Sequence, residues 1–183
     1  GDLGMLEFEN LSHAVVDYAQ NSISFNTARP EFTDSKMAGK AGVGIGSFGT
    51  YLPSARLDFK LSDRLSLSVN AAGIISKGDF PLADGSVRLN NDIKQVRGGI
   101  NLFGTMDDGE YHIKAFGNTA ERGTPGSKSW PSEDRQKDQN IYLQGSARKK
   151  FSQIYTLRAS AKAGYDRIYY TSSWGDSEYG QTE

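Results

Sequence analysis

The fold is decided by the stretch Leu65-Ser-Leu-Ser-Val-Asn-Ala-Ala-Gly-Ile-Ile-Ser76, in which apolar and polar residues alternate almost throughout. Successive side chains of a β-strand point to opposite faces of its sheet, so this alternation predicts a strand with one apolar and one polar face. The apolar face holds Leu65, Leu67, Val69, Ala71, Gly73 and Ile75, and the polar face holds Ser66, Ser68, Asn70, Ala72 and Ser76, with Ile74 as an exception. The pattern lasts for about ten residues, which is the length of a strand that crosses a membrane.

The same alternation occurs on both sides of this stretch. It predicts about seven strands, at 37–45, 54–61, 65–76, 96–106, 111–119, 141–148 and 155–166. Two interpretations fit these strands. In a water-soluble antiparallel sheet the apolar face would pack into a protein core. In the wall of a membrane β-barrel the apolar face would contact lipid and the polar face would line a wet lumen.

Two features favour the barrel. The expected apolar faces include small residues such as Gly73, Gly145 and Ala161, which would leave a soluble core poorly filled but need no fixed partner in fluid lipid. Short connections at 61–64, 106–110 and 149–153 alternate with long polar connections at 77–92 and 120–138, and 46–50 is a short loop on the side of the long ones. Outer-membrane barrels have short periplasmic turns and long extracellular loops.

The composition agrees with an all-β chain and excludes several classes of protein. The 183 residues include 21 glycines and no cysteine, and the net charge is −1. The near-neutral charge argues against a nucleic-acid-binding surface, and the lack of cysteine excludes disulfide scaffolds and cysteine-ligated zinc. The sequence contains no run of about 18 apolar residues, so it predicts no transmembrane helix. The first residues lack the basic and apolar regions of a signal peptide, so we expect a mature or trimmed chain.

The sequence offers no convincing catalytic, cofactor or metal site. His13 and His112 are far apart, and no Ser/His/Asp order or Gly-x-Ser-x-Gly elbow supports a hydrolase. Gly42-Val-Gly-Ile-Gly46 lacks the strand-then-helix context of a dinucleotide site, and we interpret it as a glycine-rich strand. Asp107-Asp-Gly-Glu110 is interpreted as a hairpin turn rather than a calcium loop. We therefore expect no enzyme, no cofactor and no metal.

Several short motifs resemble those of TonB-dependent outer-membrane receptors. Asn26-Thr-Ala-Arg-Pro-Glu31, a glycine-rich strand and Gly46-Ser-Phe-Gly-Thr-Tyr51 follow one another as at the junction of plug and barrel in that family. The plug of the family ends in a strand of the kind seen at Ile23-Ser-Phe-Asn-Thr27. Gly78-Asp-Phe-Pro81 and Glu121-Arg-Gly-Thr-Pro-Gly126 look like loop patterns of the family, especially in receptors from the Bacteroidetes. The resemblance covers roughly residues 21–183.

The resemblance implies an all-β fold, namely a fragment of a transmembrane antiparallel β-barrel with a remnant of an N-terminal plug domain. It assigns residues 1–33 to the plug remnant and linker, and residues 34–183 to the first strands of the barrel. The barrel of the family has about 22 strands around a plugged lumen, so we expect this chain to be a fragment or one piece of a split receptor. No TonB box can be identified, and the terminal aromatic residue of the family's last strand is absent.

The resemblance also implies a function in the bacterial outer membrane. A receptor of this family takes up a scarce, bulky nutrient, such as an iron-siderophore, haem or cobalamin, and is energised by a TonB-type protein of the inner membrane. Outer-membrane lipid and a surface lipoprotein are further expected partners, and nucleic acid is not. The alternatives are a passive porin or structural barrel, and a soluble β-sandwich binding module.

Ligand contacts in the family come from the plug apices and the outer loops. The candidate ligand-binding residues of this chain are the expected loop residues Phe80, Arg122, Trp130, Tyr169, Tyr170 and Trp174. Charged residues on the polar faces, such as Arg56 and Lys162, would pair with carboxylates of the plug, and ligand steering is their alternative role.

Overall fold

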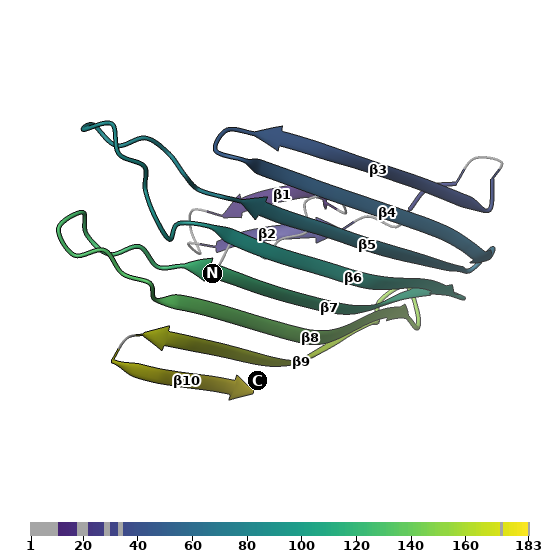
Figure 1. Cartoon of the computed structure of the whole chain (residues 1–183). Coiled ribbons are helices and arrows are strands. Elements are labelled where there is room, and N and C mark those ends of the chain that lie inside the picture. Colours follow the sequence, from purple (N-terminus) through teal and green to yellow (C-terminus); the bar gives the residue numbers. More distant parts are fainter. Residues whose placement is uncertain (1–10, 18–21, 28–29, 33–34, 173, 183) are drawn as a thin grey trace.

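The computed structural model describes residues 11–17, 22–27, 30–32, 35–172 and 174–182. These residues form β-strands joined by turns and loops, and no helix occurs among them. Two short strands, β1 (Leu11–Asp17) and β2 (Ser22–Thr27), form an antiparallel pair of their own. The other eight form one antiparallel sheet: β3 (Met37–Gly46), β4 (Thr50–Ser62), β5 (Leu65–Ser76), β6 (Ile93–Met106), β7 (Gly109–Gly123), β8 (Arg135–Lys150), β9 (Thr156–Ser172) and β10 (Gly175–Thr182) (Figure 1).

The large sheet follows the chain in order, because each strand pairs only with its sequence neighbours from β3 to β10. Each pair is antiparallel, so the whole sheet is built from local hairpins. Among the described residues the sheet is not closed, and β3 and β10 lie at its two edges. This up-and-down arrangement is compatible with part of an antiparallel β-barrel. Figure 1 shows β1 and β2 behind the large sheet.

The connections differ between the two ends of the sheet. At one end, which we call the short-turn end, β4 is joined to β5, β6 to β7 and β8 to β9 by the tight turns that the sequence predicts. In the β6–β7 turn Asp108 has a φ of 56°, a left-handed conformation that Asp tolerates. At the opposite end, which we call the loop end, the long connection 77–92 is confirmed, and 47–49 is a short turn as expected.

Three sequence-based expectations about the strands are wrong. The sheet has eight strands where about seven were expected, because β10, which was not predicted, pairs along its whole length with β9 although its residues do not alternate. The connection expected at 120–138 spans only 124–134, since β7 continues to Gly123 and β8 begins at Arg135. Strands β6 to β9 are longer than the strands expected at 96–106, 111–119, 141–148 and 155–166. They have 14, 15, 16 and 17 residues, because their hydrogen-bonded ladders continue beyond the apolar residues.

The two faces of the large sheet have the predicted polarity. We call them the apolar face, which carries Leu57, Leu67 and Ile100, and the polar face, which carries Arg56, Ser66 and Asn101. The polar face is the more enclosed: Ser66, Ser68 and Asn101 are fully buried, and the buried Phe103, Phe116 and Ala120 lie on the same face. The apolar face exposes large side chains, including Val43, Ile45, Leu57, Val96, Ile100, Ile113, Ile141, Leu143 and Leu157.

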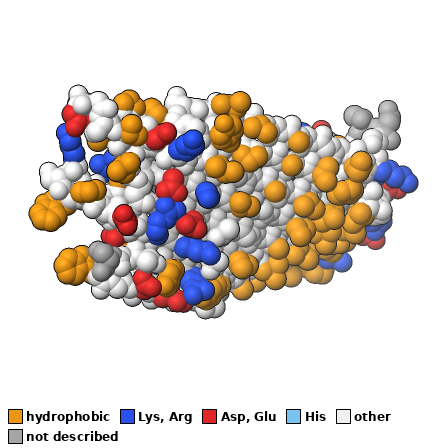
Figure 2. Space-filling view, viewed as in Figure 1, with side chains coloured by type: hydrophobic (Ala, Val, Ile, Leu, Met, Phe, Trp, Pro, Cys, Tyr) orange, Lys and Arg blue, Asp and Glu red, His pale blue; other side chains and the backbone are white. Residues whose placement is uncertain are grey.

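The exposed apolar side chains do not cover the whole length of the strands. On the apolar face Val96 lies in one cross-strand row with Thr119, Gln139 and Arg167, and the next row toward the loop end contains Lys94, Glu121 and Lys137. Figure 2 shows hydrophobic side chains gathered toward the short-turn end and charged side chains toward the loop end. We call the first region, which runs from Leu65 to Ile75 on β5 and ends near Val96 on β6, the apolar belt.

Candidate functional site

The polar face is the strongest candidate for a functional surface, because its side chains form continuous rows across neighbouring strands. Directly opposed residues on antiparallel strands lie about 4.5–5.5 Å apart, so their side chains can meet. One row contains Ser66, Phe103, His112, Ser146 and Ser160, and the next contains Asp58, Ser68, Asn101, Lys114, Gln144 and Lys162. The strand register therefore places polar groups that are far apart in the sequence at one surface.

A ladder of side-chain hydrogen bonds crosses four strands of this face. The Gln95 Nε2 donates to Asn118 Oδ1 at 2.7 Å, and the Asn118 Nδ2 donates to Asn140 Oδ1 at 3.0 Å. The Asn140 Nδ2 in turn donates to Asp166 Oδ1 at 2.6 Å. Sequence reasoning missed this ladder, although the hairpin register could have revealed it, because Asn118, Asn140 and Asp166 are directly opposed.

Aromatic rings and lysines form a second group on the polar face, nearer the short-turn end. The ring of Phe103 stacks on that of His112, with centroids 4.3 Å apart, and Phe116 stacks on Tyr142 at 5.0 Å. The Nζ of Lys114 lies 5.7 Å from the Phe116 centroid, and the Nζ of Lys162 lies 5.5 Å from that of Tyr142. At such distances a ring face attracts an ammonium group, so these contacts help to hold cations on this surface.

On β4, next to the edge strand β3, Arg56 and Asp58 form an ion pair on the polar face. The Arg56 Nε donates to both carboxylate oxygens of Asp58, at 3.0 and 2.9 Å. The two side chains are only 9% and 14% exposed. An enclosed charge is tolerated when it is paired, so this guanidinium and carboxylate stabilise each other on the polar face.

The structure does not bring the six predicted ligand-binding residues together. Three of them lie in strands rather than in the expected loops: Arg122 lies in β7, and Tyr169 and Tyr170 lie in β9. This prediction of their location is wrong because the ladders extend beyond the apolar residues. Tyr169 and Tyr170 are consecutive strand residues, so they point to opposite faces of the sheet.

Arg122 and Tyr170 share one row of the polar face, with Gln136 between them. The Arg122 Nη2 pairs with Asp138 Oδ2 at 2.9 Å, and the Tyr170 hydroxyl donates to Asp134 Oδ2 at 2.6 Å. On the opposite face the Tyr169 hydroxyl donates to Asp176 Oδ2 at 2.6 Å. Arg122 and Tyr170 are therefore the two predicted residues that could face one ligand, and both already have carboxylate partners.

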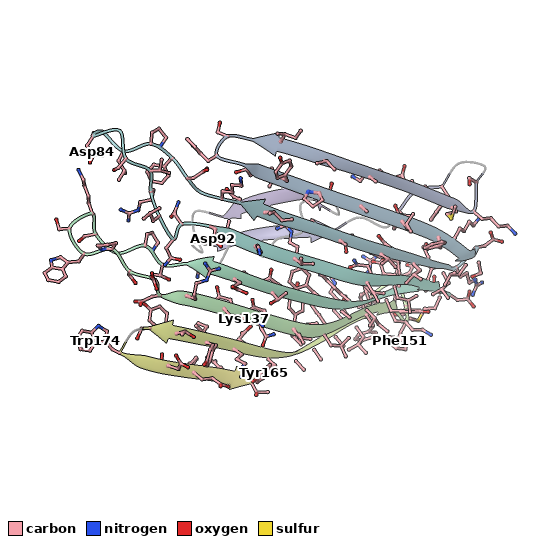
Figure 3. All side chains as sticks on the ribbon, viewed as in Figure 1. Asp84, Asp92, Lys137, Phe151, Tyr165 and Trp174 are labelled. Atoms are coloured by element: carbon pink, nitrogen blue, oxygen red, sulfur yellow. The ribbon has the colours of Figure 1, made fainter. Side chains whose placement is uncertain are left out.

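The remaining three predicted residues lie in the connections at the loop end. Phe80 packs edge-to-face against Phe48, with ring centroids 6.0 Å apart. Trp130 is 82% exposed in the β7–β8 loop, and Trp174 is 97% exposed in the β9–β10 turn. Figure 3 shows Trp174 and Asp84 at the loop end and Phe151 at the short-turn end. The two tryptophans are thus available for contact, but among the described residues no ring contact joins them to Phe80.

The two long loops are joined into one unit by contacts that sequence reasoning did not find. The Asn90 Nδ2 donates to the backbone oxygens of Ser132 and Asp134, at 2.9 and 2.8 Å, and the Arg88 Nη2 donates to Gly126 O at 2.8 Å. At the base of the loops Arg135 forms two hydrogen bonds to Asp92, at 2.7 and 3.0 Å. Both loops therefore hold a fixed position with respect to each other and to the sheet.

The electrostatics of the loop unit follow from its ion pairs. Hydrogen bonds from Lys128 and Ser86 lower the pKa of Asp84 from 3.8 to about 2, and the Lys128 Nζ lies 2.6 Å from Asp84 Oδ2. Hydrogen bonding to the Arg135 guanidinium likewise lowers the pKa of Asp92.

A cavity of about 250 Å³ lies between the loops and is lined by Leu82, Val87, Leu89, Pro125 and Pro131 among others.

Two further features of the described residues concern possible metal ligands and membrane helices. Within the residues that the structure describes, no group of three or more His, Asp or Glu side chains could hold a metal ion. The described residues contain no helix that is long and apolar enough to span a membrane. Comparison of the chain with models of known protein families and with curated proteins finds no match.

Proposed function

We propose that the large sheet is part of the wall of an outer-membrane β-barrel, and that this barrel is a TonB-dependent receptor for uptake of a scarce, bulky nutrient. The observation that carries the proposal is the inverted burial of the sheet. Polar Ser66, Ser68 and Asn101 are fully buried, whereas Val96, Ile141 and Leu157 on the other face are 60%, 63% and 58% exposed.

This inversion would be costly in water. Full burial of a large aliphatic side chain is worth roughly 1.5–3 kcal/mol, so each half-exposed one forgoes about 1 kcal/mol. The nine exposed apolar side chains that the description of the fold names on this face would together forgo a free energy of burial comparable with the total stability of a typical domain, roughly 5–15 kcal/mol. Contact with lipid acyl chains on this face would remove that cost, whereas the polar face keeps water and polar partners.

The height of the apolar belt supports a bilayer as the occupant. From Leu65 to Ile75 the strand advances ten residues, which corresponds to about 33 Å along the strand. At the strand tilt of about 40° that is usual in barrels, this length gives a height of about 25 Å. The apolar band of outer-membrane barrels is about 25 Å tall. The longer β6 to β9 then extend beyond the bilayer at the loop end, which we assign to the outside of the cell.

The open edges of the sheet support a larger barrel. In lipid, an unpaired strand edge leaves backbone N–H and C=O groups without hydrogen-bond partners, and each such group costs several kcal/mol. The edges at β3 and β10 therefore require further strands to close the wall. The resemblance to TonB-dependent receptors supplies the remaining parts of the proposal: a plug remnant and linker at 1–33, and barrel strands from residue 34 onward.

The proposed ligand is an iron-siderophore, haem or cobalamin, and the proposed partner is a TonB-type energy-transducing protein. A surface lipoprotein is a further proposed partner. The test uses cells that express the full-length protein and are given each radiolabelled nutrient, with and without a protonophore that collapses the energy supply. A receptor of this class takes up one nutrient only in energised cells. Uptake that continues after the protonophore would identify a passive porin instead.

The membrane part of the proposal has its own test. The full-length protein should require detergent for extraction and should remain folded in detergent micelles. A protein that leaves the cells in aqueous buffer as a folded monomer would identify a soluble β-sandwich, in which a second sheet covers the apolar face.

A further inference from the structure

We propose that the polar face carries an oxyanion-binding site near the short-turn end, formed by Arg148 of β8 and Arg158 of β9, which binds a carboxylate or phosphate group. The two arginines are directly opposed in the β8–β9 ladder. Like charges at directly opposed positions repel each other and destabilise the pair of strands. An anion held between the two guanidinium groups would turn this repulsion into attraction.

The neighbouring carboxylate does not neutralise both arginines. Glu110 lies opposite Arg148 in the same row, and its Oε1 is 3.2 Å from the Arg148 Nε. Within the part of the chain that the structure describes, Arg158 has no ion pair. The row therefore contains two guanidinium groups and one carboxylate, which leaves one positive charge in excess.

A cavity adjoins these arginines and supplies further hydrogen-bond donors. Its volume is about 580 Å³, and its lining includes Arg148, Arg158, His112, Ser146, Ser160 and Gln144. Guanidinium groups present paired N–H donors that match the geometry of carboxylates and phosphates, and hydroxyl and amide groups add single donors. The cavity is large enough for a phosphate group together with part of the molecule that bears it.

The position of the His112 ring on the cavity wall is fixed. The ring stacks on Phe103 with an angle of 7° between the planes, and its Nε2 lies 3.0 Å from Asn101 Oδ1. Asn101 is fully buried in the sheet, and its contact with the Nε2 therefore anchors the imidazole to the sheet. The cavity thus has one rigid aromatic wall and one wall of exposed arginines, an arrangement suited to an anionic group.

The oxyanion has two sources, and the chain itself is one of them. The first 28 residues contain Asp2, Glu7, Glu9 and Asp17 but no lysine or arginine. A carboxylate of this acidic segment, or a free phosphate-bearing molecule, would provide the same chemistry. The site is inferred from the polar face alone, so it does not depend on the proposed transport function.

The test is an isothermal calorimetric titration of the full-length protein in detergent with inorganic phosphate, at constant ionic strength. A free site should bind phosphate, and Arg158→Gln or Arg148→Gln should weaken binding by about tenfold or more, since each removes a charge-assisted contact. Lys60→Gln is the matched control, because Lys60 lies on the polar face but is already paired with Asp63 at 2.8 Å. Its phosphate affinity should stay within about twofold of the unaltered protein.

A second protein separates the two sources. It carries Asp2→Asn, Glu7→Gln, Glu9→Gln and Asp17→Asn. If a carboxylate of the chain occupies the site, the unaltered protein does not bind phosphate, the neutralised protein does, and a further Arg158→Gln removes that binding. If phosphate binds to neither protein, or binds equally well after Arg158→Gln and Arg148→Gln, the site does not exist.

Discussion

The halves of strands β6 to β9 nearest the short-turn end and nearest the loop end obey different rules. Near the short-turn end most residues alternate, with exposed Ile100, Ile113 and Leu143 on one face and polar or aromatic groups on the other. Near the loop end both faces carry charged side chains: Lys94, Glu121 and Lys137 form a row on the apolar-face side, and Arg122 and Gln136 lie on the polar face.

The difference is what the proposed membrane wall predicts, namely that one ladder of backbone hydrogen bonds passes through two environments. The ladder itself is continuous, because β7 and β8 pair from Gly109–Lys149 to Gly123–Arg135. Only the side chains change, from exposed apolar ones to charged and polar ones. If the proposed wall is correct, a boundary between lipid and water, rather than a structural boundary, lies near Gln139 and Arg167, and each prediction below tests one side of it.

The largest effect is expected in the middle of the apolar belt. Leu143→Arg should lower the free energy of unfolding by about 2–4 kcal/mol in lipid vesicles, because it places a cation near the bilayer midplane. Denaturant unfolding of the full-length protein in vesicles measures this loss.

The matched control for Leu143→Arg is Gln139→Arg, on the same strand and the same face but at the boundary. It should cost only about 0–1 kcal/mol, because charge is tolerated near the interface. Equal losses for the two substitutions would contradict the assignment of the belt to lipid.

The same boundary explains how far the sequence could predict the fold. Period-two alternation predicted β5 with both of its faces, and turn signals predicted the short connections. Alternation ceases where both faces carry polar side chains, so the ends of β7 and β8 were interpreted as a loop although their backbones remain paired. For the same reason β10, whose residues Gly175, Asp176, Ser177 and Glu178 carry no apolar face, was not predicted.

The candidate site was less predictable than the fold, because it depends on register. Arg122 and Tyr170 were selected as separate loop residues, yet the ladder places them in one row with Gln136 between them. The contacts of Asn90 with the β7–β8 loop join residues more than 40 positions apart. No local pattern indicates such a contact, since it depends on how two irregular loops pack together.

A second prediction concerns the packing of the loop end. Gly78 has a φ of +61°, and a Cβ there would collide with the backbone oxygen of Asn91. Gly78→Ala should therefore cost about 1–3 kcal/mol from overpacking, in addition to the strain of a left-handed residue. Gly85→Ala is the control, because Gly85 has a φ of +83° but open space around its Cβ. Denaturant unfolding should show the larger loss for Gly78→Ala, and equal losses would mean that the loop base is not tightly packed.

A third prediction concerns the polar ladder beside the boundary. Asn140→Leu removes the partner of both the Asn118 Nδ2 and the Asp166 Oδ1. The expected loss of stability is about 1 kcal/mol, at the low end of the range for unsatisfied groups, because water reaches these half-buried atoms. Gln144→Leu lies on the same strand and face, and Gln144 has no hydrogen bond from its side chain within the described residues, so it should change stability less. The opposite order would show that the ladder contributes nothing.

The smallest effect is expected at the tip of the loop unit, where Lys128 pairs with Asp84. The pair is exposed and screened by salt, so it contributes little to global stability. Since the folded pKa of Asp84, about 2, lies below its ordinary value of 3.8, the stabilisation is present above the ordinary value and is lost as the pH falls through about 2.

Pepsin should therefore cut the loop at 77–92 slowly at pH 4 and faster near pH 2. Lys128→Gln should allow fast cutting already at pH 4, because it removes the main cause of the lowered pKa. Lys150→Gln, at the short-turn end, should leave the cutting rate unchanged. If Lys128→Gln and the unaltered protein were cut at the same rate at pH 4, the contacts of Asn90 and Arg88 with the β7–β8 loop, rather than this pair, would hold the two loops together.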